Sequence, residues 1–228
     1  DMPFDAAWVI AWARLAADAV RERREELTAL DAAIGDGDHG ENLDRGLHAA
    51  VAALDEAQAS GRGPATPAEA LKTVATTLIT TAGGAAGLLL GTACLRAARA
   101  AQAAGGDDGW IDTAGVARIL HEACAGAQSR GRAEPGDKTM VDAWYPAAEA
   151  AQLAADEGLG PVEAIERAAR AAAEGAAATE PLRARKGRAS YLGERSRGHR
   201  DPGAESTAIL LAAAARAARR SRDAADEG

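Results

Sequence analysis

The sequence predicts an all-α protein of about eight helices, folded as a single domain over residues 1–228. Alanine, the strongest helix former, supplies 64 of the 228 residues, whereas Val and Ile, which favour strands, together supply only 14. Apolar residues also recur at helical spacing between glycine and proline breakers. This composition and this spacing both disfavour a β-rich fold.

The helical segments follow one another with clear apolar faces. Trp8 and Trp12 lie four residues apart in the first segment, and Leu43 and Leu47 do so in the second. The expected segments are about residues 5–30, 41–59, 67–81, 85–104, 113–130, 137–156, 161–180 and 204–220.

Capping residues mark where several of these helices begin. Thr66 followed by Pro67 is typical of an N-cap with proline at the first helical position, so it opens the third segment. Asp112 or Thr113 begins the fifth segment, and Asp137 is a plausible N-cap for the sixth.

Composition and charge also limit the function classes. The net charge is −8 and no basic stripe occurs, so we expect no nucleic-acid partner. No run of about 18 apolar residues is present, so we expect no membrane span. Cys94 and Cys124 lie in alanine-rich helical stretches and are expected to be buried thiols without a disulfide. No signal-peptide pattern follows Asp1, which makes the cytoplasm the expected location.

The strongest chemical signal is an acidic, glycine-rich loop near the amino end. Asp31, Asp36 and Asp38 lie within eight residues and are separated by glycines. Three carboxylates this close repel one another unless a cation lies among them, and carboxylate oxygens are the ligands that Mg²⁺ and Ca²⁺ prefer. The loop therefore favours a metal site, although a turn with one helix-capping Asp remains an alternative.

Two more specific motifs do not fit this loop. An EF-hand beginning at Asp36 would place Leu47 where a Glu is required. The glycines match the spacing of a dinucleotide-binding turn, but no strand precedes them.

Two further glycine loops precede helices. Residues 81–87 would let backbone N–H groups approach a phosphate, or would simply form a tight connection between helices. Residues 131–140 resemble a Walker A loop, but Asp137 stands between Gly136 and Lys138 and no strand precedes it.

The segment 182–203 has no helical period and gathers cations in an acidic chain. Loops this long are usually functional or disordered, and clustered arginines suggest an anion contact. We expect it to act as a lid over an anion site, with a solvated flexible loop as the alternative. Its cations are Arg183, Arg185, Lys186, Arg188, Arg195, Arg197 and Arg200.

Taken together, residues 31–42, 81–92, 133–147 and 187–204 resemble the L subunit of dihydroxyacetone kinases, or the equivalent C-terminal nucleotide domain of single-chain kinases. The four stretches occur in the family's order and span most of the chain. The resemblance implies a barrel of eight antiparallel helices with a nucleotide site in the loops at one end.

The resemblance also implies roles for individual residues. Asp31, Asp36 and Asp38 would hold two Mg²⁺ ions that bridge the phosphates of ADP or ATP, and Arg188 would add positive charge during phosphoryl transfer. The residues implied to contact the nucleotide are His39, Gly40, Glu41, Asn42, Gly83, Gly84, Ala85, Ala86, Gly87, Gly131, Thr139, Met140, Arg188, Asp201, Pro202 and Gly203. Ala86 stands where the family usually has Ser, so a phosphate contact there must come from backbone or water.

In such kinases the sugar is held on a separate K subunit or domain, so the resemblance implies that this chain works in a complex. The L-type chain either exchanges ADP for ATP, or keeps ADP bound while a phosphohistidine-carrying M subunit of the sugar phosphotransferase system recharges it.

Three other functions stay open at this point. In the first, the chain is still a kinase subunit, but the acceptor is another ketose, such as a tetrulose. In the second, the chain binds ADP as a regulatory protein without turnover. In the third, the acidic loop is part of a metal-binding helical scaffold.

Overall fold

The computed structural model describes residues 4–105 and 111–228. Within these two ranges the chain forms nine α-helices and one 3-10 helix, and no strand. The all-α prediction is therefore confirmed. The elements are α1 (Ala6–Glu22), α2 (Arg24–Ile34), α3 (His39–Ala59), α4 (Pro67–Thr81), α5 (Gly84–Gly105), α6 (Thr113–Gly131), α7 (Val141–Asp156), α8 (Pro161–Ala178), η2 (Arg188–Ser196) and α9 (Pro202–Asp226).

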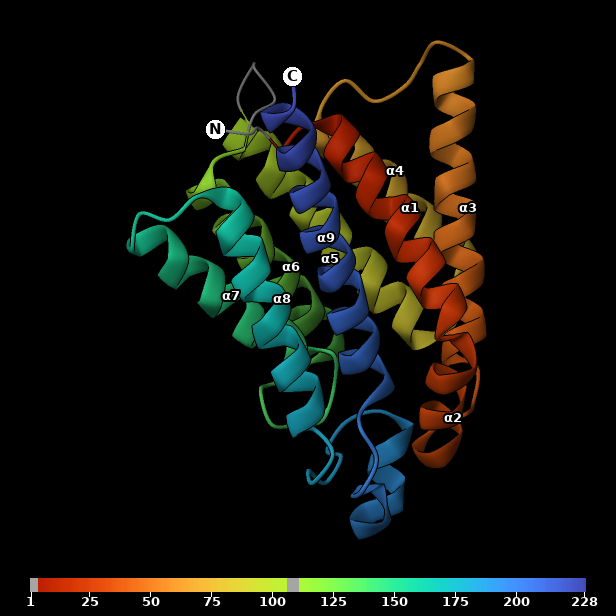
Figure 1. The fold of residues 1–228 in the computed structure, drawn as a ribbon. Helices are drawn as coiled ribbons and strands as arrows, with labels where there is room; N and C mark the ends of the chain where they lie inside the picture. The colour runs from red at the N-terminus through yellow and green to blue at the C-terminus, as the bar shows by residue number, and fades with distance from the viewer. Residues whose placement is uncertain (1–3, 106–110) are drawn as a thin grey trace.

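The helices close into a barrel (Figure 1). Following the contacts, α1 packs on α3, each later helix packs on the next, and α9 returns to α1. Because α2 continues α1 past an elbow, the ring has eight members, as the resemblance implies. Small residues allow the helices to approach closely: a Cβ at Gly175 of α8 would overlap the carbonyl oxygen of Asp142 in α7.

The capping residues identified in the sequence predicted several helix starts correctly. The Thr66 hydroxyl accepts a hydrogen bond from the Glu69 N–H, and Asp112 accepts one from the Gly115 N–H at 2.8 Å. Both thiols are buried and free, as expected. Among the described residues, no helix combines the length and the apolar character that crossing a membrane requires.

Three expectations about the elements are wrong. The first segment is two helices, because the backbone bends at Arg23 (φ −105°, ψ 13°). The sequence has no glycine or proline there from which a break could be predicted. The segment 182–203 was expected to have no helix, but it contains the 3-10 helix η2. Asp137 does not cap the sixth segment: its carboxylate accepts from the Glu134 N–H at 2.8 Å within the preceding turn, and α7 begins only at Val141.

The up-and-down topology brings four connections to the same end of the barrel. These are the turns between α2 and α3, between α4 and α5 and between α6 and α7, and the segment that joins α8 to α9. Figure 1 shows α2 and the segment around η2 at this end, opposite the end of α9. The loops in which the sequence places chemistry are therefore neighbours in space.

Candidate functional site

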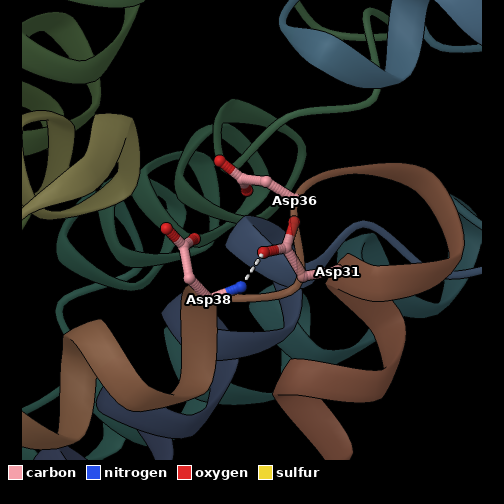
Figure 2. A group of neighbouring side chains, drawn as sticks. All are labelled: Asp31, Asp36 and Asp38. Atoms are coloured by element: carbon pink, nitrogen blue, oxygen red, sulfur yellow. Dashed lines mark hydrogen bonds between the residues drawn. The ribbon is translucent and has the colours of Figure 1, made fainter.

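The three aspartates of the acidic loop converge (Figure 2). Asp31 lies in the last turn of α2, Asp36 in the following turn, and Asp38 directly before α3. One carboxylate oxygen from each lies within 4.8 Å of the other two. This donor set consists of hard oxygen ligands from the end of α2 and the turn that follows it, and such ligands are the ones that a divalent cation such as Mg²⁺ prefers.

Asp31 is the anchored member of this triad. Its Oδ2 accepts hydrogen bonds from the backbone N–H groups of Asp38, at 2.9 Å, and His39, at 3.0 Å. The carboxylate is only 8% exposed. Burial raises its pKa above the ordinary value, and the negative charges of Asp36 and Asp38 raise it further. A positive ion between the three groups would relieve this penalty.

Glycine 35 makes room for the anchored carboxylate. A Cβ at Gly35 would overlap Oδ1 of Asp31 and lie 3.1 Å from the Asp31 carbonyl oxygen. This close approach explains why a glycine follows α2 directly.

His39 joins the triad turn to the start of α9. Its Nε2 lies 2.9 Å from the Ser206 hydroxyl, which itself donates to the Gly203 carbonyl oxygen at 3.1 Å. Because the hydroxyl proton is used in that bond, the assignment that satisfies both groups places the imidazole proton on Nε2. Burial lowers the pKa of His39 to about 4, so the ring is neutral at pH 7.

The turn before α5 is held by Arg45 of α3. The Arg45 guanidinium donates to the carbonyl oxygens of Thr81, at 3.1 Å, and Ala82, at 2.7 Å. It also donates to Oδ1 of Asn42 at 2.7 Å, which leaves the Asn42 amide N–H₂ free to donate elsewhere. A Cβ at Gly84 (φ +66°) would lie 2.8 Å from that amide nitrogen, so glycine is required here.

These turns surround a pocket of about 390 Å³, a size typical of small-molecule sites. Many of the expected nucleotide contacts line it together with the triad, drawn from all four connections at this end of the barrel. They are His39, Asn42, Gly84, Ala85, Ala86, Gly131, Thr139, Met140, Arg188, Asp201, Pro202 and Gly203.

Four of the expected nucleotide contacts do not line the pocket. Gly40 and Gly87 are buried and serve close packing, since a Cβ on either would overlap a neighbouring helix end. Glu41 and Gly83 are exposed at the surface beside the pocket. The resemblance implied whole stretches as nucleotide contacts, and it did not separate these positions from their lining neighbours.

The pocket lining combines polar and apolar groups. The polar groups include the triad and the amino end of α5, whose first N–H groups lack helical partners and can bind an anion. The apolar part of the lining was missed by the sequence reasoning except for Met140, because apolar side chains carry no local chemical signal. It includes Leu88, Leu89, Ala127, Ala133, Met140 and Val141.

The segment that joins α8 to α9 (residues 179–201), called here the covering segment, contributes cations to the pocket lining. Arg188 lies at the start of η2, and its Nε is 3.4 Å from Oδ2 of Asp36. Lys186, in the same segment, and Arg130, at the end of α6, also line the pocket. Gly187 adopts φ +68° directly before Arg188, a conformation that favours glycine.

Lys138 is a second feature that the sequence did not explain. Its side chain is buried, and Nζ donates to the carbonyl oxygens of Thr179, Glu180 and Leu182 at 2.9, 3.3 and 3.0 Å. These carbonyls follow the end of α8, where carbonyls lack helical partners. Lys138 therefore ties the α6–α7 connection to the start of the covering segment.

The chain is similar to known proteins over most of its length. Residues 33–216 match the DAK2 domain family. The PEP-dependent dihydroxyacetone kinase ADP-binding subunit DhaL of Escherichia coli (strain K12) is 38% identical over 96% of this chain and 100% of its own length. The corresponding subunit of kinase 1 of Listeria innocua is also 38% identical, over 92% of this chain and 96% of its own.

Longer proteins contain a similar region. The L-erythrulose 1-kinase of Mycolicibacterium smegmatis is 39% identical over 84% of this chain, which covers 32% of that protein. The crystal structure of the dihydroxyacetone kinase of C. freundii has a TM-score of 0.64 at 25% identity, covering 92% of this chain and 34% of that one.

The fold, the site and these matches define a phosphotransferase component: the chain belongs to the DAK2 domain family of kinases. Its full-length relatives place it among the L-type subunits of dihydroxyacetone kinases, which confirms the resemblance seen in the sequence.

Proposed function

We propose that this chain binds ADP or ATP through two Mg²⁺ ions on Asp31, Asp36 and Asp38, and passes the phosphoryl group to dihydroxyacetone held by a separate K subunit. The observation that carries the proposal is the convergence of three carboxylates within 4.8 Å in a pocket whose lining also includes apolar side chains. A nucleotide needs both kinds of surface, because it has charged phosphates and a flat base.

Each part of the pocket has a separate task in this proposal. Bound Mg²⁺ would neutralise charge on the phosphate oxygens. The backbone N–H groups at the start of α5 and the free amide of Asn42 donate to those oxygens, while Met140 and the other apolar side chains pack on the base. Arg188 approaches the transferring group from the covering segment and stabilises its charge in the transition state.

No side chain is required as a nucleophile in this scheme. Phosphoryl transfer depends mainly on positioning and on charge stabilisation, and the acceptor hydroxyl comes from the sugar. The partner's sugar site would therefore face the covered end of the barrel. The names of the full-length relatives describe PEP-dependent kinases, which supports PEP as the source of the phosphoryl group. In this proposal a phosphohistidine-carrying M subunit delivers it, with exchange of ADP for ATP as the alternative.

The test is the variant Asp36→Ala. We expect it to abolish Mg²⁺-dependent ADP binding in calorimetry and to leave the helical circular-dichroism signal unchanged, because Asp36 is exposed and makes no buried hydrogen bond. Asp55→Ala removes an exposed carboxylate of α3 far from the pocket and serves as the control. Wild-type binding by Asp36→Ala would refute the metal assignment.

A tetrulose is a second candidate acceptor, supported by the 39% identity to an L-erythrulose 1-kinase. Assays of dihydroxyacetone and erythrulose with the cognate K subunit would separate the two. A complex that binds nucleotide but turns over neither ketose would instead indicate a regulatory ADP-binding protein.

A further inference from the structure

Four charged side chains beside the pocket form a closed ring of ion pairs, called here the ion-pair ring: Arg23, Glu26, Arg200 and Glu205. Arg23 donates to Glu205 at 2.6 Å and to both oxygens of Glu26 at 2.8 Å. Arg200 closes the ring, with Nη2 3.0 Å from Glu26 and Nη1 2.9 Å from Glu205. Each carboxylate therefore has two guanidinium partners.

The ring members come from three separate parts of the chain. Arg23 is the elbow between α1 and α2, Glu26 lies in the first turn of α2, Arg200 ends the covering segment, and Glu205 lies in the first turn of α9. The pairing of Arg23 with Glu205 joins residues 182 positions apart. Arg23 lowers the pKa of Glu26, as expected for an ionised pair.

Glu205 is the buried member, with its side chain only 8% exposed, while the other three are about one third to two fifths exposed. A buried carboxylate is costly unless it is paired, and burying an ion pair for stability alone is often no better than apolar packing. This cost points to a role of the ring in fixing the geometry of the site, in addition to a role in stability.

The two elements that the ring joins, α2 and α9, each contribute a neighbouring wall of the pocket. One end of α2 bears Arg23 and Glu26, and the other bears Asp31 of the triad. Residues 201–203, which end two positions before Glu205, line the pocket, and Ser206 directly after Glu205 lies 2.9 Å from His39. The ring and the His39–Ser206 contact thus join the same two walls at two points.

We propose that Arg23, Glu26, Arg200 and Glu205 are positioning residues of the nucleotide site: the ion-pair ring holds the start of α9 against α2 at the separation that a bound nucleotide requires. This inference rests on the proposed nucleotide function, and it adds residues that touch neither phosphate nor metal. Arg200 also fixes the end of the covering segment, so the ring couples the position of Arg188 to the same wall.

The experiment compares Arg200→Gln, Glu205→Gln and the double variant in the full chain, with calorimetry of Mg·ADP and thermal melting. We expect each single variant to bind Mg·ADP about five- to tenfold more weakly, because the competent arrangement of the two walls becomes a minor population. The double variant should lose less than the product of the single losses, since both remove the same ring. Arg200→Lys, which keeps the charge, should regain part of the affinity that Arg200→Gln loses.

The matched control is Asp44→Asn. Asp44 is also 8% exposed and pairs with two arginines near the same elbow, Arg21 at 3.0 Å and Arg24 at 3.2 Å, but it does not line the pocket. We expect it to lower the melting temperature while the Kd for Mg·ADP stays within about twofold of wild type.

The outcomes separate the two proposals. If wild type binds Mg·ADP and both ring variants bind it equally tightly while melting earlier, the ring is structural only and the inference is overturned. If wild type itself does not bind Mg·ADP, the proposed function fails, and the ring's positioning role fails with it. If Glu205→Gln does not fold, Arg200→Gln decides, because Arg200 lies in a loop and its loss leaves Glu205 paired with Arg23.

Discussion

Adding one methyl group at Gly35 tests whether the anchored geometry of Asp31 creates the metal site. The Gly35 backbone (φ −145°, ψ −141°) has a negative φ, so a left-handed conformation is not the obstacle. The obstacle is the Cβ itself, which would overlap Oδ1 of Asp31. In Gly35→Ala the carboxylate must therefore move.

The structure sets the size of the effect. Moving the carboxylate breaks its hydrogen bonds from the Asp38 and His39 N–H groups. Hydrogen bonds to a charged group contribute about 1.5–3 kcal/mol each, and renewed hydration of the carboxylate offsets part of the loss, so we expect destabilisation of about 3 kcal/mol. For a chain of this size that corresponds to a fall in Tm of about 6–12 °C. Misplacing one of three metal ligands should raise the Kd for Mg·ADP about 30- to 100-fold, or 2–3 kcal/mol.

Calorimetry with Mg·ADP and thermal melting followed by circular dichroism measure both quantities. Gly160→Ala is the matched control, because Gly160 has φ −72° and a Cβ there would meet no atom within 4 Å. Wild-type Mg·ADP affinity in Gly35→Ala would show that binding does not depend on the fixed position of Asp31, and the reasoning from this geometry would fail.

Three further predictions follow from the same structure. Lys138→Met should lower the free energy of unfolding by about 2–3 kcal/mol, because three carbonyl oxygens after α8 lose their donor; denaturant unfolding measures this, and an unchanged midpoint would contradict it. Saturating Mg·ADP should stabilise the chain by about 2.7 kcal/mol at a hundred times Kd, and EDTA should remove that gain; a melting temperature insensitive to EDTA would contradict the metal-dependent site. Burial raises the pKa of Cys94 to about 12 and of Cys124 to about 11, so raising the pH from 7 to 9 should accelerate thiol labelling of the unfolded chain but not of the folded one; rapid labelling of the native protein at pH 9 would show that the thiols are accessible.

Much of the fold could be predicted because its signals are local. The Thr66-Pro67 start of α4 and the Asp112 cap of α6 depend on bonds within three residues, so the sequence contains all that is needed to find them. The bend at Arg23 has no such signal, since it coincides with ion pairs to α9 and the covering segment that only the folded chain brings together.

The sequence alone determined the carboxylate cluster, because Asp31 at the end of α2 and Asp36 and Asp38 in the glycine-rich turn after it lie within eight residues, and short-range geometry was enough to bring their side chains together. It also determined the alternation of helices and breakers from which the barrel is built. Only the tertiary structure decided which apolar side chains join the triad in the pocket lining, where the Lys138 ammonium lies, and how Glu205 meets Arg23. Those arrangements join residues that are distant in the chain. They arise when the helices close into a ring, and no local sequence pattern predicts which residues then meet.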